Sequence, residues 1–194
     1  AFAWPLWPLS PWPASIFRPQ RNPPPRPKRL RLSKTAFDRL DAAINDLLPP
    51  GSNLETLGGG FVWAEGPVWM GSYLLFSDVP TNRVYKWEEN RGVSIFLEPS
   101  GYTSREPRGG ETGSNGLTRD SRGRLVLCQH GDRRIARLER NGTFTPVAEF
   151  YMFRRFNSPN DLVYDRKGNL YFTDPAYGMA ADMAYPKKEL PFQG

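Results

Sequence analysis

The amino-acid sequence predicts an all-β chain that forms part of a β-propeller. A short turn recurs three times, and each copy is followed by an apolar run, a Gly-containing turn and a strand-like run. The copies are Trp63-Ala64-Glu65-Gly66-Pro67, Gly113-Ser114-Asn115-Gly116-Leu117 and Asn157-Ser158-Pro159-Asn160-Asp161-Leu162. The apolar positions Val68, Leu117 and Leu162 that follow the turns lie 49 and 45 residues apart. Four-stranded propeller blades have about this period.

Residues 1–34 have a composition that predicts a disordered extension. Nine of the 20 prolines lie in residues 1–32, and this spacing disfavours regular helix or strand. Seven of the 26 basic residues and none of the 20 acids lie in residues 1–34, so the rest of the chain is close to neutral. The net charge of +6 therefore does not predict that the folded part binds nucleic acid. Alternatives for the segment are a mistranslated upstream sequence, a degenerate targeting segment, a Pro-rich ligand and a basic tail that binds nucleic acid.

Residues 35–48 predict one helix, which leads into the domain by residue 50. Thr35 is suited to cap its first turn, and Asp38 completes a capping box. Its apolar residues follow helical spacing: Phe37, Leu40, Ile44, Leu47 and Leu48. Two prolines and a glycine at residues 49–51 end the helix. We expect its apolar face to pack on the side of the domain.

Residues 51–194 predict the propeller itself, and from about residue 55 the pattern is all-β. Besides the strands of the repeated unit, short strand-like runs lie at residues 84–87, 93–97, 135–138 and 144–148. Turn sequences such as Asn141-Gly142 separate them. The longest loop, residues 98–113, is of the kind that forms a lid or faces substrate. We expect about three blades of a longer propeller, because closed propellers have about four to eight.

Each copy of the repeated turn carries an oxygen ligand at the same place, namely Glu65, Asn115 and Asn160. One such ligand per blade predicts that the three converge on a common axis. Carboxylate and amide oxygens favour Ca²⁺ or Mg²⁺ over Zn²⁺. Each turn alone also has a simpler interpretation, since a Glu-Gly-Pro turn can be solvated and Asn residues favour turns. Recurrence in phase favours the ligand interpretation.

Three further residues are candidates for the same site. His130 is the single histidine and ends a strand-like run at a position that Asp78 and Asp174 approach in the other repeats. We expect His130 to contact substrate or a metal ligand, although a lone histidine is more often structural. We expect Asp174 to line the same channel; its alternative is a turn acid. Tyr102 either covers the site or only pins the long loop.

Two other residue types in this region have simpler expectations. Cys128 is the single cysteine, so no intrachain disulfide is possible, and its place in an apolar run predicts a small core residue. Arg133 and Arg134 are expected to be solvated rather than to bind substrate.

The chain resembles the gluconolactonase branch of the SMP-30/gluconolactonase/LRE-like family. Six segments in the family's order carry the resemblance: residues 63–69, 99–102, 113–117, 125–134, 156–162 and 171–178. The match spans about residues 35–194. It implies the N-terminal half of a six-bladed propeller hydrolase. It also implies that Glu65 and Asn160 are metal ligands, and that Asn115 binds metal or substrate. A further Asp ligand from a later blade, often proposed as the general base, would lie beyond Gly194.

The resemblance implies a metal-dependent hydrolase that opens a sugar lactone such as gluconolactone. Ca²⁺ or another divalent cation such as Mg²⁺ would polarise the lactone carbonyl for attack by water. In this scheme His130 and Asp174 are catalytic, while Asn115, His130 and Tyr102 bind substrate. The alternative is a catalytically incomplete propeller that acts as a binding or scaffold protein. No apolar run is long enough to cross a membrane, and the sequence leaves open the oligomeric state and whether the protein is cytoplasmic or exported.

Overall fold

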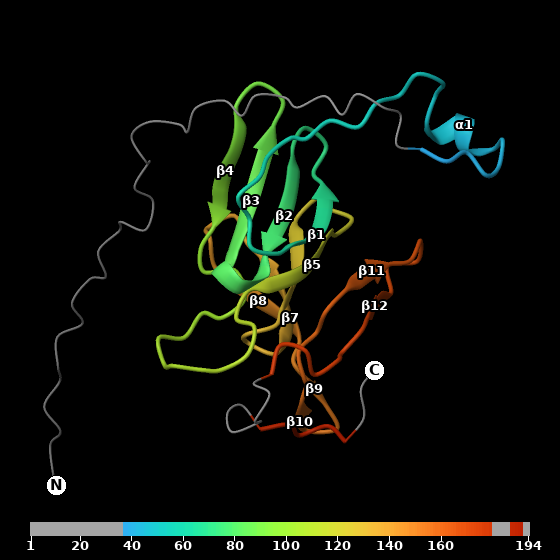
Figure 1. Ribbon diagram of the computed structural model, residues 1–194. Coiled ribbons are helices and arrows are strands. Elements are labelled where there is room, and N and C mark those ends of the chain that lie inside the picture. The colour runs from blue at the N-terminus through green and yellow to red at the C-terminus, as the bar shows by residue number, and fades with distance from the viewer. Residues whose placement is uncertain (1–36, 180–186, 192–194) are drawn as a thin grey trace, which may run out of the picture.

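The computed structural model describes residues 37–179 and 187–191, and its sheets are all antiparallel. Two four-stranded sheets dominate it, each with its strands in chain order (Figure 1). The first contains β1 (Ala64–Trp69), β2 (Leu74–Asp78), β3 (Arg83–Glu88) and β4 (Gly92–Leu97). The second contains β5 (Ser114–Arg119), β6 (Leu125–Gln129), β7 (Arg134–Leu138) and β8 (Phe144–Ala148). This chain order within each sheet is the arrangement of a propeller blade.

A third, two-stranded sheet pairs β11 (Leu162–Tyr164) with β12 (Leu170–Phe172), which are the strands of the third repeat. A short hairpin, β9 (Phe150–Tyr151) and β10 (Arg154–Arg155), lies between the second and third sheets in the sequence. The sequence did not predict this hairpin. A single 3₁₀ turn (Val79–Thr81) follows β2. The prediction of an all-β, propeller-like chain is confirmed, whereas the segment expected to be disordered, residues 1–34, lies outside the described residues.

The helix prediction was wrong in length and in packing. The helix α1 (Ile44–Leu47) has four residues, and the remainder of the described segment before it is irregular or in turns. Leu40 is 95% and Leu47 is 78% exposed, so the apolar spacing does not mark a face that packs on a sheet. Figure 1 shows α1 standing apart from the strands. Short helices are marginal without tertiary packing, which explains why the pattern alone did not produce a longer one.

β6 is the strand around which the sheets pack, because it is buried along its whole length. Leu125 and Leu127 join a core cluster with Leu75 and Val84 of the first sheet. Val126 and Cys128 alternate with them and join a second cluster with Leu162 of the third sheet. Successive side chains of a strand point to opposite faces, so one strand contributes to both interfaces. The prediction that Cys128 is a core residue is confirmed.

The first strands of the three sheets are neighbours. β5 contacts β1 and β2 on one side and β11 on the other. The repeated turns that carry the predicted ligands lie at the start of these strands, so the packing brings one end of all three sheets together.

Candidate functional site

The second of the three repeated turns lies directly against the first and the third. Gly66 has a φ of 56°, and a Cβ atom added there would lie 2.8 Å from Gly116 Cα. A Cβ atom on Gly116 would in turn lie 2.8 Å from the carbonyl oxygen of Asn160. The Gly116 N–H donates a 2.7 Å hydrogen bond to that same oxygen. The glycines therefore let three backbones approach more closely than any side chain would permit.

A bulge recurs at these turns in the first two sheets. The pairing of β1 with β2 shifts by one residue between Glu65 and Val68, and that of β5 with β6 shifts between Ser114 and Leu117. A β-bulge bends its strand and re-aims the side chains beside it. The recurring sequence turn thus corresponds to a recurring distortion, which places Glu65 and Asn115 at matching positions of neighbouring strands.

The three predicted ligands differ in what surrounds them. The half-buried Glu65 accepts a 3.0 Å hydrogen bond from Trp63 Nε1. Asn115 is buried, and Ser77 Oγ donates to its backbone oxygen at 2.8 Å. Asn160 directs its Nδ2 toward His130 Nε2, 3.4 Å away. Across the part of the chain that the structure describes, no three His, Cys, Asp or Glu side chains gather as a metal cluster.

Two acids hold the backbone that leads into the first and third turns. Asp78 Oδ1 accepts a 2.9 Å hydrogen bond from the Trp63 N–H, and Asp174 Oδ2 accepts one of 2.8 Å from the Asn157 N–H. Asp174 is buried, and this burial raises the pKa of its carboxyl although the backbone hydrogen bonds act to lower it. Asp174 therefore has a structural task that the sequence did not reveal, and its catalytic role stays a prediction.

Gln129 occupies the position in the second sheet that Asp78 and Asp174 occupy in the first and third repeats. The expectation that His130 occupies this position was wrong. Ala64 pairs with Asp78, and Ser114, the equivalent of Ala64, pairs with Gln129. The Gln129 side chain donates to the Ser100 carbonyl at 2.9 Å, and Ser100 Oγ accepts from the Ser114 N–H at 3.0 Å. Gln129 thus supports the second turn through the long loop. Aligning the repeats at the first residues of β2 and β6, instead of looking for a titratable side chain, would have identified Gln129.

His130 lies one residue further on and is completely buried. Its Nε2 faces Asn160, and its Nδ1 lies 3.3 Å from Glu111 Oε2. A Cβ atom added to Gly178 would lie 2.9 Å from Nδ1, so the backbone of residue 178 closes the remaining side. In this arrangement the ring contacts a predicted metal ligand and has no exposed surface for substrate.

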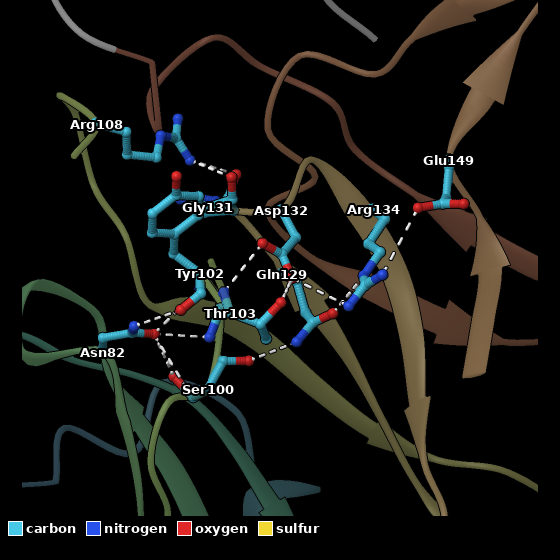
Figure 2. Close-up of polar contacts among 12 residues, drawn as sticks. Asn82, Ser100, Tyr102, Thr103, Arg108, Gln129, Gly131, Asp132, Arg134 and Glu149 are labelled. Atoms are coloured by element: carbon cyan, nitrogen blue, oxygen red, sulfur yellow. Dashed lines mark hydrogen bonds and ion pairs between the residues drawn. The ribbon is translucent and has the colours of Figure 1, made fainter. Parts of the chain in front are cut away.

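The long loop, residues 98–113, is fixed to the same end of the sheets. Asn82 Oδ1 accepts hydrogen bonds from the N–H groups of Ser100, Gly101 and Tyr102 at 3.1, 2.7 and 3.2 Å. Thr103 binds Asp132 through both its N–H, at 3.0 Å, and its hydroxyl, at 2.6 Å. Figure 2 shows these contacts tying the loop to the first sheet at Asn82 and to the second at Asp132.

Tyr102 pins this loop. Its hydroxyl donates a 2.7 Å hydrogen bond to the Glu106 carbonyl, and the Arg108 guanidinium lies 5.6 Å from its ring centre. Arg108 also donates to the carbonyl oxygens of Gly131 (Figure 2) and of Gly178, the latter at 2.7 Å. The contacts favour the pinning alternative for Tyr102, and its contact with substrate stays a prediction.

The expectation that Arg133 and Arg134 are solvated was wrong. Arg133 is buried, and its Nε donates to the Phe156 carbonyl at 2.7 Å. Arg134 Nε donates to Gln129 Oε1 at 2.6 Å, and its guanidinium also reaches Asp132 and Glu149 (Figure 2). The loops at this end carry many backbone carbonyls and acids, and these give the guanidinium groups partners. A shallow depression lined by Arg122, Arg124, Glu139, Arg140 and Asn141 contains none of the predicted site residues.

Comparison with known proteins places these features in a wider group. The family model described as "SMP-30/Gluconolactonase/LRE-like region" matches residues 63–188. A gluconolactonase from Zymomonas mobilis is 39% identical over 161 residues, which are 80% of this chain and 44% of that protein. The structure of a Xanthomonas campestris gluconolactonase superimposes with a TM-score of 0.68 at 29% identity, covering 87% of this chain and 54% of that one. The chain thus spans about half the length of these relatives.

Proposed function

Because the chain belongs to the SMP-30/gluconolactonase/LRE-like family, we propose that it takes part in hydrolysing a sugar lactone. The observation that carries the proposal is the contact of the second turn with the first and the third, each turn holding one oxygen donor, Glu65, Asn115 or Asn160. The relatives named above are described as gluconolactonases, which supports an aldonolactone as the substrate class.

We propose that these three side chains bind Ca²⁺ or Mg²⁺. One carboxylate and two carboxamides are the donors that hard divalent cations prefer, and two neutral donors limit the negative charge around the ion. The 3.4 Å contact of Asn160 Nδ2 with His130 supports the fit, because it leaves the oxygen end of the carboxamide for another partner. A cation held there would polarise the lactone carbonyl and stabilise the oxyanion.

The other residues have supporting roles in this proposal. Asn115 orients the cation or the substrate, and Tyr102 contributes through the loop that it pins. Asp174 keeps the third turn in place through the Asn157 N–H. The resemblance implies a further Asp ligand that also serves as general base, so the proposed hydrolysis refers to the whole protein.

A non-enzymatic binding or scaffold protein is the second candidate. It is favoured by the burial of His130 and by the backbone contact of Asp174, since these groups were expected to face substrate. The two candidates differ in what a cation should do. An enzyme needs it for turnover, whereas a scaffold need not bind it.

Calcium titration of the chain by isothermal calorimetry, and a lactone-hydrolysis assay of the whole protein with and without EDTA, test the proposal. We expect Glu65→Gln to abolish tight Ca²⁺ binding and turnover together. Glu106→Gln, an equal change of charge on the exposed part of the long loop, is the matched control and should alter neither. Unchanged turnover in Glu65→Gln would overturn the assignment.

A further inference from the structure

We propose that Glu111 and His130 together orient the Asn160 carboxamide, so that its oxygen faces the cation site. This inference rests on the proposed function, and it gives the long loop a part in the site. Glu111, His130 and Asn160 come from three different segments: the loop before β5, the end of β6 and the turn before β11. We call this group the Glu111–His130–Asn160 relay.

The first step is the position of the imidazole ring between two polar groups. Its Nδ1 lies 3.3 Å from Glu111 Oε2, and its Nε2 lies 3.4 Å from Asn160 Nδ2. The ring is fully buried, and Nδ1 forms no hydrogen bond within the described residues, so the Glu111 carboxylate is the charged group beside it. A carboxylate beside Nδ1 favours the tautomer in which Nδ1 carries the hydrogen.

The second step follows from that tautomer. With the hydrogen on Nδ1, the Nε2 lone pair can accept a hydrogen bond, and a carboxamide can donate only through its nitrogen end. The two ends of an Asn side chain are nearly equal in shape, so packing alone selects poorly between them. Acceptance by Nε2 therefore fixes Asn160 with its Nδ2 toward His130 and its Oδ1 free for a cation.

The third step is the rigidity of the relay. Arg108 donates to the carbonyl oxygens of His130, at 3.3 Å, and of Gly178, at 2.7 Å, and so ties the loop to both segments that enclose the ring. Gly178 leaves no space for a side chain beside Nδ1. On the C-terminal side of Glu111, the Gly113 N–H donates to the Val79 carbonyl at 2.9 Å. These contacts fix the backbone segments that enclose the ring.

Residues that orient a metal ligand without touching the metal typically change metal affinity 10–100-fold when replaced. We therefore expect Glu111→Gln to weaken Ca²⁺ binding about tenfold, by calorimetry on the full chain, with little change in thermal midpoint. Glu106→Gln lies in the same loop and should leave the affinity unchanged. In an Asn160→Asp background both ends of the side chain are oxygens, so Glu111→Gln should lose most of its effect. A general packing role would produce the same loss in both backgrounds.

A second measurement is independent of any metal. His130 is the only histidine in the chain, so its two ring nitrogens give isolated signals in a ¹⁵N-labelled sample. We expect the metal-free wild type to show hydrogen on Nδ1 and none on Nε2, and Glu111→Gln to shift the ring toward the other tautomer. Hydrogen on Nε2 in the wild type, or an unchanged ring in Glu111→Gln, would overturn the relay. If the ring behaves as expected but Ca²⁺ does not bind, the proposed metal site fails while the orientation of Asn160 stands.

Discussion

Replacing Gly116 by alanine should push the second and third ligand turns apart. The added Cβ atom would lie 2.7 Å from Asp161 Oδ1 and 2.8 Å from both Asn160 O and Asp161 Cα. Ordinary van der Waals contact begins at 3.4 Å, so the neighbouring backbone must retreat by about 0.6 Å. Two of the three atoms belong to the backbone, which cannot move aside as a flexible side chain can.

The cost can be worked from two contributions. Overpacking of a filled site costs about 1–3 kcal/mol. Weakening the 2.7 Å hydrogen bond from the Gly116 N–H to Asn160 O adds about 0.5–1.5 kcal/mol. We therefore expect Gly116→Ala to lower the free energy of unfolding by about 1.5–4.5 kcal/mol, a large part of the stability of an ordinary domain.

Urea denaturation, followed by tryptophan fluorescence, measures this loss. Gly59→Ala is the matched control, because that glycine has no positive φ and no atom within 4 Å of its added Cβ. It should be as stable as the wild type or slightly more so. Equal stability of Gly116→Ala and Gly59→Ala would refute the argument that close approach of the turns limits this position. Calcium affinity should fall in Gly116→Ala alone, since only that variant separates the turns.

Leu127→Ala should cost about 2–5 kcal/mol in urea denaturation, because Leu127 is fully buried between the first two sheets, whereas Leu40→Ala, at a site 95% exposed, should cost almost nothing. Hydrogen bonds from Asn169 and Lys167 lower the pKa of Asp165, so its contribution is present above the unfolded carboxyl pKa of about 3.9 and is lost as pH falls through the lower folded value. Asp165→Asn should thus flatten the acid side of a plot of urea midpoint against pH. Burial raises the pKa of Asp174, so its effect on folding is the opposite of that of Asp165. The protein becomes more stable as pH falls through the raised pKa of Asp174. Asp174→Asn should remove that gain in the same measurement, while a steeper acid loss in wild type than in the variant would contradict it.

The sheets were predictable because their signal is local and repeated. The turns at Glu65, Asn115 and Asn160 occur at a blade-like spacing, and the short runs between them have strand composition. The length and packing of the helix were not predictable, because the apolar spacing over residues 35–48 does not indicate whether the helix has a surface to pack on. Leu40 follows the pattern and is nevertheless almost fully exposed.

The site was predictable as a set of turns but not as a set of contacts. The turns occur at the same place in each repeat, which predicts that they lie close together. In the structure the backbone of the second turn adjoins those of the first and the third. The task of Gln129 depends on strand register, which the bulge at residues 114–117 displaces by one residue. The task of Asp174 depends on its contact with the Asn157 N–H, 17 residues away in the sequence. The partners of His130 come from the long loop and the third turn, more than 15 residues away in either direction, and no local pattern encodes such a meeting.

The alternation of β6 has a consequence for how this protein can vary. Leu125 and Leu127 belong to the interface with the first sheet, and Val126 and Cys128 to the interface with the third. A substitution in this strand therefore affects the interface with the first sheet if its residue number is odd and the interface with the third sheet if it is even. The two interfaces can accumulate changes separately, as long as the length of the strand is kept. Deleting a single residue would exchange the two sets of side chains and disturb both interfaces at once.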